Sequence, residues 1–193
     1  MADARTEPTG HDAIVVAGGR SSRLGTDKTR LAIEGVPLLD RVLTAVADAG
    51  QLVVVGEPRP VALPVAWARE DPVGGGPAAG VVAGMEYVTA PVVMLLAGDL
   101  PRIDAPTVHR LLDATTESDD GAILVDRNGR RQHLTCAVVA SALRRAAAAR
   151  STWHDAAMHE LLADLRLRPV PVQGREADDI DTPADLTANE EGP

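Results

Sequence analysis

Short aliphatic runs alternate along this sequence with segments whose apolar residues recur at helical spacing. Three of these runs are AIVVA (Ala13–Ala17), LVVV (Leu52–Val55) and VVMLL (Val92–Leu96). Strands that are aliphatic throughout are typical of parallel sheets with helices on their faces. The alternation therefore predicts a single-domain, three-layer α/β/α sandwich around a mostly parallel sheet.

The remaining elements follow from the same periodicities and from turn residues. Further strands are predicted at Val65–Ala68, Ala122–Val125, Leu134–Val139 and Val170–Val172. Helices are predicted at Leu38–Ala49, Pro77–Tyr87, Pro106–Asp113, Ser141–Ala149 and Trp153–Leu165, with a last one from Pro183. Gly50 is the expected cap of the first helix, and Asn128-Gly129 predicts a turn between two strands.

Composition limits both the core and the partners of the chain. Hydrophobic residues make up 45% of the 193 residues but aromatic residues only 2%, so Val, Leu, Ala and Ile must build the core. The net charge of −9 argues against nucleic acid and anionic membranes as partners. Cys136 is the single cysteine and is expected to be a small buried hydrophobe, which fits a reducing compartment.

The sequence shows no signal-peptide pattern at its start and no run of roughly 18 apolar residues that would span a bilayer. We therefore expect a cytoplasmic protein. Residues 1–10 and 189–193 have the composition of disordered tails.

Three unusual loops follow predicted strands. GGRSSRLGTDK follows the first strand, REDPVGGGPAAG follows the run at Val65–Ala68, and GDLPRID follows VVMLL. Ligands of parallel α/β sheets bind at the carboxyl ends of the strands. These loops are therefore expected to gather at one edge of the sheet and to hold the chemistry.

The first loop, AGGRSSRLGTDK, has the composition of a phosphate-binding loop. It matches neither the P-loop pattern, which ends in Gly-Lys-Ser/Thr, nor the G-x-G-x-x-G dinucleotide pattern. Its glycines, Gly18 and Gly19 among them, let backbone N–H groups approach an anion, and Arg23 and Lys28 add positive charge. The alternative is an ordinary strand-to-helix turn with solvated arginines.

Two other loops carry carboxylates. Asp99 follows a buried strand, where a carboxylate facing phosphates would hold Mg2+, although it could also cap the turn before Pro101. Asp71 precedes Gly74–Gly76 and could accept hydrogen bonds from a base edge, whereas the alternative is a flexible loop before Pro77.

Near the end of the chain, Thr182 and Pro183 are explained by helix capping, whereas Asp179 and Asp181 are not. These two could supply a second carboxylate to the metal. His133 lies near an arginine-rich turn and could contact an anionic substrate.

The segment VVAGGRSSRLGTDKTRLAIEGVPLLDRV resembles the N-terminal signature of nucleotidyltransferases with a Rossmann-like NTP-transferase fold. GGGPAAG, LLAGDLP and IDTPADL resemble later motifs of that family in the right order, so the resemblance covers Asp12 to Leu186. Ala17-Gly18-Gly19 is most similar to the molybdenum cofactor guanylyltransferases (MobA type), since related cytidylyltransferases more often have Ala-Ala-Gly. The resemblance implies an NTP-transferase domain over residues 11–188.

That resemblance also implies a reaction. GTP would donate GMP to the terminal phosphate of molybdenum cofactor (molybdopterin), pyrophosphate would leave, and Mg2+ would assist. By this resemblance Val16, Ala17, Gly18, Lys28 and Asp71 would bind GTP, and Asp99 would bind both GTP and the metal ion. Beyond the resemblance, we expect Gly19 to bind GTP and Arg23, Lys28 and Asp99 to be catalytic, and Asp181 could be a second metal ligand. Arg23 and Lys28 would stabilise the leaving pyrophosphate.

The sequence departs from the family in two places. Asp179-Ile180-Asp181 stands where many members have Asn-x-Asn, and QHLTCAVV replaces a more usual segment containing His-Pro. Two alternatives stay open: a related cytidylyltransferase or sugar- or lactate-phosphate nucleotidyltransferase, and a non-catalytic protein that binds nucleotide and cofactor. The protein could also make transient contacts with proteins of cofactor biosynthesis or with molybdoenzymes.

Overall fold

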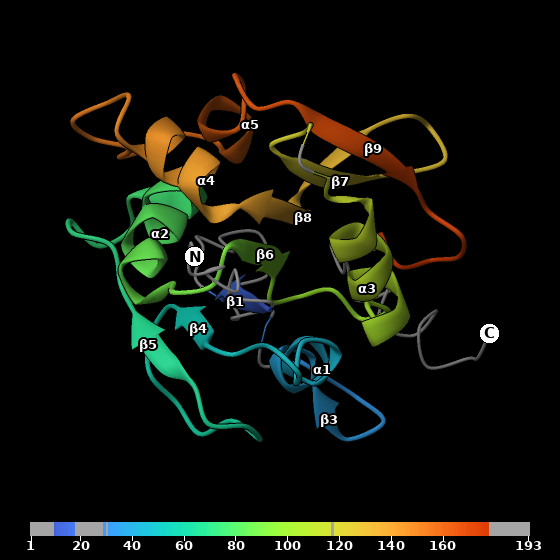
Figure 1. The fold of residues 1–193 in the computed structure, drawn as a ribbon. Coiled ribbons are helices and arrows are strands. Elements are labelled where there is room, and N and C mark those ends of the chain that lie inside the picture. Colours follow the sequence, from blue (N-terminus) through green and yellow to red (C-terminus); the bar gives the residue numbers. More distant parts are fainter. Residues whose placement is uncertain (1–9, 18–28, 30, 117, 178–193) are drawn as a thin grey trace, which may run out of the picture.

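The computed structural model describes residues 10–17, 29, 31–116 and 118–177 (Figure 1). Their centre is a seven-stranded sheet in the order β5-β4-β1-β6-β8-β7-β9. The strands are β1 (His11–Val16), β4 (Leu52–Val55), β5 (Ala66–Ala68), β6 (Val92–Ala97), β7 (Gly121–Val125), β8 (Arg131–Val139) and β9 (Leu167–Pro171). Only β8 runs against its neighbours, so the prediction of a mostly parallel sheet is confirmed.

Helices cover both faces of this sheet, as the alternation predicted. They are α1 (Leu38–Ala45), α2 (Gly76–Gly84), the short 3-10 helix η2 (Met85–Tyr87), α3 (Ala105–Ala114), α4 (Ala140–Ala147) and α5 (Met158–Leu161). Figure 1 shows α1 and α3 on one side, and α2 and α4 on the other.

The core is divided between the two faces because strand side chains alternate. Ala13 and Val15 of β1 pack with α1 and α3, whereas Ile14 and Val16 pack with α2, α4 and α5. All four side chains are buried. A strand that must bury both faces needs an aliphatic residue at every position, which is why these strands appear as continuous runs in the sequence.

Several predicted elements differ from the structure at their ends. The helix expected to reach Ala49 stops at Ala45, because Val46 and Ala47 donate to carbonyls three residues back and tighten the last turn. Gly50 instead donates to the carbonyl of His11 and begins the approach to β4. The expected turn is present, since Gly129 has a φ of 80° and donates to Asp126.

The helix predicted over Trp153–Leu165 is wrong in its extent. Only the single turn α5 forms, and the residues before it make a loop in which Asp155 has a φ of 58°. A second small sheet, β2 (Ala32–Ile33) with β3 (Val36–Pro37), was not predicted. Its tight turn places Glu34 and Gly35 at positive φ.

Some sequence predictions lie outside the described residues: the last helix from Pro183, and the tails at 1–10 and 189–193 apart from Gly10. The domain limits 11–188 therefore stay a prediction. Within the described part of the chain, no helix has the length and apolar character needed to cross a membrane.

Candidate nucleotide site

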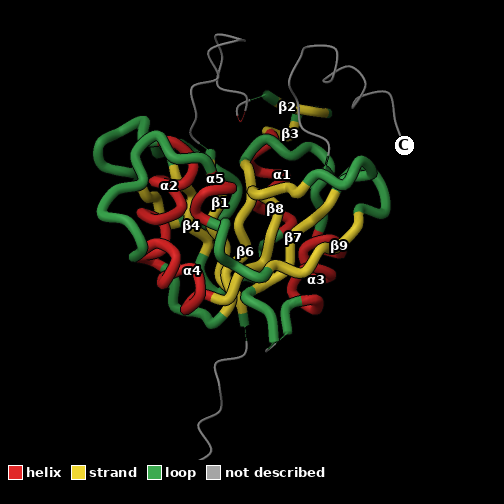
Figure 2. Tube along the Cα trace, turned by 90° about the horizontal axis from the view of Figure 1, so that it is seen from above, coloured by secondary structure: helices red, strands yellow, loops and turns green. Residues whose placement is uncertain are grey.

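Four parallel strands, β5, β4, β1 and β6, end at the same edge of the sheet; Figure 2 shows the strands of the sheet lengthwise. Backbone hydrogen bonds continue one residue beyond the strands at this edge. Ala17 donates to Val55 (2.9 Å), Gly56 to Ala68 (3.0 Å) and Gly98 to Val16 (2.9 Å). The starts of the three loops singled out in the sequence are therefore held together, as the topology predicted.

Gly98 allows an unusually close approach between the first and the last of these loops. A Cβ on Gly98 would lie 3.2 Å from the Cα of Ala17 and 3.2 Å from the Cγ2 of Thr29. Ala17 and Thr29 are the described residues that flank positions 18–28. Any larger residue at position 98 would push these segments apart, so glycine there keeps Asp99 beside them.

A cavity of about 620 Å³ opens at this edge. Its walls come from the ends of β1 and β4, from the segment after β5, from the start of α2 and from the loop before α5. The lining residues are Val16, Ala17, Val55, Gly56, Glu57, Arg59, Arg69, Glu70, Val73, Gly74, Gly76, Pro77, Gly80, Asp155, Ala156 and Ala157. Its size and mixed apolar and polar lining suit a small-molecule ligand.

The glycine-rich segment forms one wall of the cavity. Gly74 and Gly76 have φ angles of 83° and 88°, which side-chain-bearing residues rarely adopt. Asp155 donates from its backbone to the carbonyl of Gly75 (2.7 Å), so the loop before α5 is fixed against this wall. The glycine-rich segment therefore lines a cavity large enough for a ligand. That it contacts a ligand stays a prediction.

Helix α2 begins at the cavity and packs tightly on the sheet behind it. Gly76 and Pro77 line the cavity, so the helix N-terminus, with its unpaired N–H groups and positive dipole end, borders it. A Cβ on Gly80 would lie only 2.9 Å from the Cγ1 of Val55. Gly80, which also lines the cavity, therefore allows α2 to lie directly against β4.

The predicted site residues fall into three groups. Val16 and Ala17 line the cavity, and Asp99 is half-buried just beyond β6. Asp71 is exposed and lines a neighbouring cavity of about 360 Å³. The others lie outside the described residues, namely Gly18, Gly19, Arg23, Lys28, Asp179 and Asp181.

The predicted metal site therefore rests on Asp99 alone among the described residues. Within that part of the chain, no group of three His, Cys, Asp or Glu side chains is placed to hold a metal ion. Asp99 as a ligand stays a prediction.

His133 lies at the start of β8, and its ring centroid is 6.1 Å from that of His159 on α5. Burial lowers the pKa of His133 below its usual value, and the charges of Arg131 and His159 lower it further. Its predicted contact with an anionic substrate is untested. Cys136 is fully buried, which raises the pKa of its thiol to about 12, so it is an inert core residue as expected.

Sequence reasoning missed Glu70, Arg59 and the loop that contains Asp155. Glu70 precedes Asp71 in the segment Arg69-Glu70-Asp71, and Arg59 donates a hydrogen bond to the buried Thr29. Asp155 follows β8 and α4, far along the chain, and no local pattern connects it with this edge.

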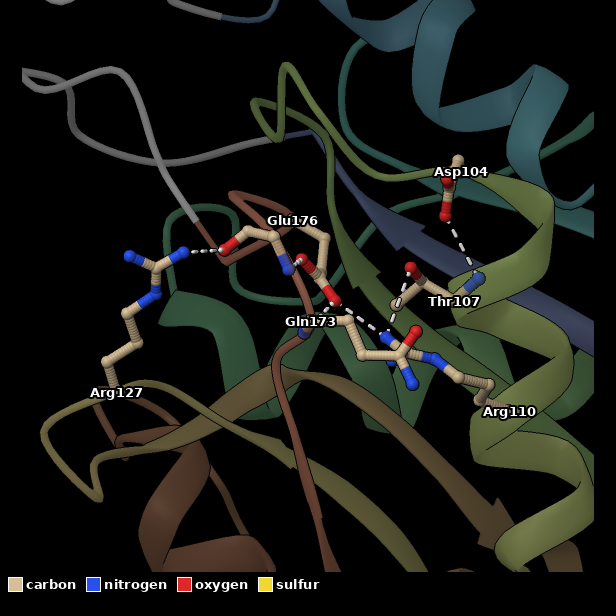
Figure 3. A network of polar contacts seen from close by, with 7 residues as sticks. Asp104, Thr107, Arg110, Arg127, Gln173 and Glu176 are labelled. Atoms are coloured by element: carbon tan, nitrogen blue, oxygen red, sulfur yellow. Dashed lines mark hydrogen bonds and ion pairs between the residues drawn. The ribbon is translucent and has the colours of Figure 1, made fainter. Parts of the chain in front are cut away.

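A second missed feature fixes the chain after β9 (Figure 3). Glu176 is buried, and its carboxylate accepts hydrogen bonds from Arg110 (2.6 Å) and from the backbone of Gln173 (2.8 Å) and Gly174 (2.6 Å). Burial alone would raise the pKa of Glu176, but these hydrogen bonds hold it below its usual value. The pair ties the segment before position 178 to α3.

The sheet order and the placement of this site define an α/β nucleotidyltransferase fold. A chain of Archaeoglobus fulgidus, described as molybdopterin-guanine dinucleotide biosynthesis protein A, is similar at 23% identity with a TM-score of 0.67, covering 93% of this chain and 97% of that one. The 2-C-methyl-D-erythritol 4-phosphate cytidylyltransferase of Thermus thermophilus is similar at 19% identity with a TM-score of 0.66, over the same shares.

Residues 13–170 match the family described as "MobA-like NTP transferase domain", and the chain belongs to this family. A relative in Trichormus variabilis, named probable molybdenum cofactor guanylyltransferase, is 38% identical over 96 residues, 47% of this chain and 46% of the relative. A Bacillus cereus relative of the same name is 33% identical over 132 residues, 64% of this chain and 66% of the relative. The chain thus spans from under half to just under two thirds of the length of these relatives.

Proposed function

We propose that this protein is a nucleotidyltransferase that transfers GMP from GTP to the terminal phosphate of molybdenum cofactor and releases pyrophosphate. The observation that carries the proposal is the cavity at the carboxyl edge, which begins at Ala17 and lies next to the strand end that presents Asp99. The family supports nucleotidyl transfer, and the names of the two relatives support guanylyl transfer to this cofactor.

In this proposal the nucleotide occupies the cavity. Val16 and Ala17 line this cavity, and the N-terminus of α2 borders it. Arg59 and Arg69 line the same space, and their positive charges favour a polyanionic ligand in a chain of net charge −9. Arg23 and Lys28 are proposed to add charge from the first loop, as the sequence predicts.

The reaction needs no covalent enzyme intermediate. An oxygen of the acceptor phosphate attacks the α-phosphorus of GTP, the bond from that phosphorus to the bridging oxygen breaks, and the electron pair leaves with pyrophosphate. The protein contributes positioning and neutralisation of charge. Gly98 holds the Asp99 segment against Ala17, which keeps the two sides of the site at a fixed separation.

Mg2+ fits the donor chemistry of this edge. Magnesium prefers oxygen ligands and is held by one or two carboxylates together with substrate phosphates and water, so the single described carboxylate of Asp99 suffices on the protein side. Asp181 is proposed as a second carboxylate. When bound, the ion would supply charge stabilisation to the phosphate oxygens.

Pyrophosphate release tests the proposal. Purified protein is incubated with Mg2+, molybdenum cofactor and one of GTP, CTP, ATP or UTP, and pyrophosphate is measured over time. Release with GTP well above the other three is expected. Release mainly with CTP would favour a cytidylyltransferase, whose fold this chain matches equally well. GTP binding without any release would favour the non-catalytic carrier.

A further inference from the structure

Arg59 belongs to the loop that follows β4 and lies at the wall of the large cavity. It stands between Pro58 and Pro60, and each proline narrows the backbone conformations that are open to the chain at this point. The side chain of Arg59 is half-buried and donates a hydrogen bond to the hydroxyl of Thr29. An arginine of the β4 loop is therefore fixed to a residue that lies 30 positions earlier in the chain.

Thr29 also touches the loop that follows β6. It is buried, and its Cγ2 lies 3.2 Å from the position that a Cβ on Gly98 would take. The Cα of Ala17, the first residue after β1, lies 3.2 Å from that same position. In the sheet, β4 and β6 are the two neighbours of β1. Thr29 therefore bridges the loops of these two strands beside the end of β1.

This bridge holds the two ends of the first loop together. Ala17 and Thr29 are the described residues on either side of positions 18–28, which contain Arg23 and Lys28. A loop whose ends are both held loses less conformational entropy when a ligand orders it than a loop with one free end. Because Thr29 follows Lys28 directly, a bond that fixes Thr29 also limits where the chain can present Lys28.

We propose that Arg59 is a positioning residue for the phosphates of the nucleotide: through Thr29 it holds the end of the first loop, so that Lys28 meets the triphosphate. The inference rests on the proposed function, because it assumes that GTP binds at this edge with its phosphates on the first loop. General attraction of anions needs only an exposed positive charge, and it leaves the bond from Arg59 to the buried hydroxyl of Thr29 unexplained.

Isothermal titration with GTP and with GMP, each in the presence of Mg2+, tests the inference. GMP lacks the two phosphates that leave, so the preference for GTP over GMP measures what these phosphates contribute to binding. In Arg59→Met this preference is expected to fall on the order of 10-fold, because the loop has lost a hydrogen bond from a charged group. GMP itself should bind with nearly wild-type affinity.

Variants of Thr29 separate positioning from direct contact with phosphate. Thr29→Val removes the hydroxyl but keeps the charge of Arg59 and a branched side chain beside Gly98, and it should lower the preference as much as Arg59→Met does. Thr29→Ser keeps the hydroxyl and should keep most of the wild-type preference. In the double variant of Arg59→Met with Thr29→Val the two losses should not add, because both changes break the same bond.

Arg144→Met is the matched control. Arg144 of α4 also donates a hydrogen bond within the chain, to the carbonyl of Val88 (2.6 Å), but Val88 precedes β6 and lies at the opposite edge of the sheet. This variant should keep the wild-type preference for GTP over GMP. Thermal unfolding shows which variants are folded, and the two Thr29 variants decide the inference if Arg59→Met does not fold.

Three outcomes in wild-type protein distinguish the inference from the proposed function. If the protein binds neither GTP nor CTP, the proposed function fails and the inference fails with it. If it binds CTP alone, guanylyl transfer fails, and the same variants measured with CTP and CMP decide the inference. If it binds GTP no more tightly than GMP, the phosphates contribute nothing to binding and the inference alone is overturned.

The variants give the remaining outcomes. If Thr29→Val keeps the wild-type preference while Arg59→Met loses it, Arg59 acts on the phosphates directly and its positioning role is overturned. A wild-type preference in both folded variants would overturn that role as well. Equal, non-additive losses in the two variants, with the preference kept in Thr29→Ser and Arg144→Met, would support it.

Discussion

Two buried or half-buried carboxylates at opposite edges of the sheet show how this fold separates stability from function. Asp12, at the amino end of β1, is 1% exposed and accepts hydrogen bonds from the backbone of Gln51 (2.8 Å), Thr89 (2.6 Å) and Ala90 (2.8 Å). The hydroxyl of Thr89 adds a fourth (3.2 Å). The chain itself satisfies both oxygens of the Asp12 carboxylate.

At the carboxyl edge the arrangement is reversed. Glu70 accepts one hydrogen bond, from the backbone of Gly74, and lines a cavity of about 620 Å³. The surrounding wall is built from glycines and a helix N-terminus, which offer N–H groups and space. The comparison shows that two carboxylates of the same chemistry differ in how many of their hydrogen-bond partners the protein supplies.

Replacing Asp12 should give the largest effect, and on stability alone. Asp12→Ala leaves three backbone N–H groups without their acceptor in the interior, which costs about 4 kcal/mol of unfolding free energy. Guanidinium unfolding measures the loss. Pyrophosphate release per folded molecule should stay near the wild-type value, and a strong loss of turnover in folded protein would break the comparison.

Replacing Asp99 should give the opposite result. Asp99→Asn keeps the shape of a half-buried side chain but removes its charge, and we expect turnover to fall on the order of 10²- to 10³-fold, as for other electrostatic contacts to a transition state. Stopped-time pyrophosphate assays measure the rate, and the melting temperature serves as the control. Turnover close to wild type would remove Asp99 from the proposed site.

Two glycines of α2, Gly80 and Gly84, test whether ligand binding in the cavity can be changed separately from the stability of the core. Gly80→Ala places a Cβ 2.9 Å from Val55, and Gly84→Ala places one 3.0 Å from Ile14, so each should cost about 1–2 kcal/mol of stability after the gain in helix propensity. Only Gly80 lines the cavity. Thermal unfolding should therefore show similar losses, whereas titration with GTP should show weaker binding for Gly80→Ala alone.

The smallest effect concerns pH at the amino edge. Burial lowers the pKa of His11 below its usual 6.5, although the Asp48 carboxylate opposes this shift, and the charge of His109 adds to it while that of Asp12 opposes it. The unfolded chain therefore takes up a proton at higher pH than the folded one, so stability falls as the pH drops below about 6.5.

The slope from one such group is at most about 1.4 kcal/mol per pH unit. Urea unfolding between pH 7.5 and 5.5 should show a smaller loss for His11→Gln than for wild-type protein. Equal losses would show that other groups account for the pH dependence.

Much of the fold follows from local patterns. The run at Leu52–Val55 is a strand with the same limits in the structure, and GGGPAAG begins a helix as predicted. Such elements are predictable because a buried strand needs apolar residues throughout and a helix start favours Pro. The helix predicted over Trp153–Leu165 was wrong in its extent. The apolar spacing of this segment suits a helix, but the chain around Asp155 bends over the glycine-rich wall.

The sequence by itself determined the alternation of strands and helices, the three loops at the carboxyl edge and the likeness to nucleotidyltransferases, because each depends on neighbouring residues. Only the tertiary structure decided which of two adjacent acids meets the cavity, since one peptide unit turns Glu70 inward and Asp71 outward. It alone also brought Asp155 to Gly75 and Arg110 to Glu176. These contacts join segments far apart in the chain, and their energy depends on packing rather than on any local pattern.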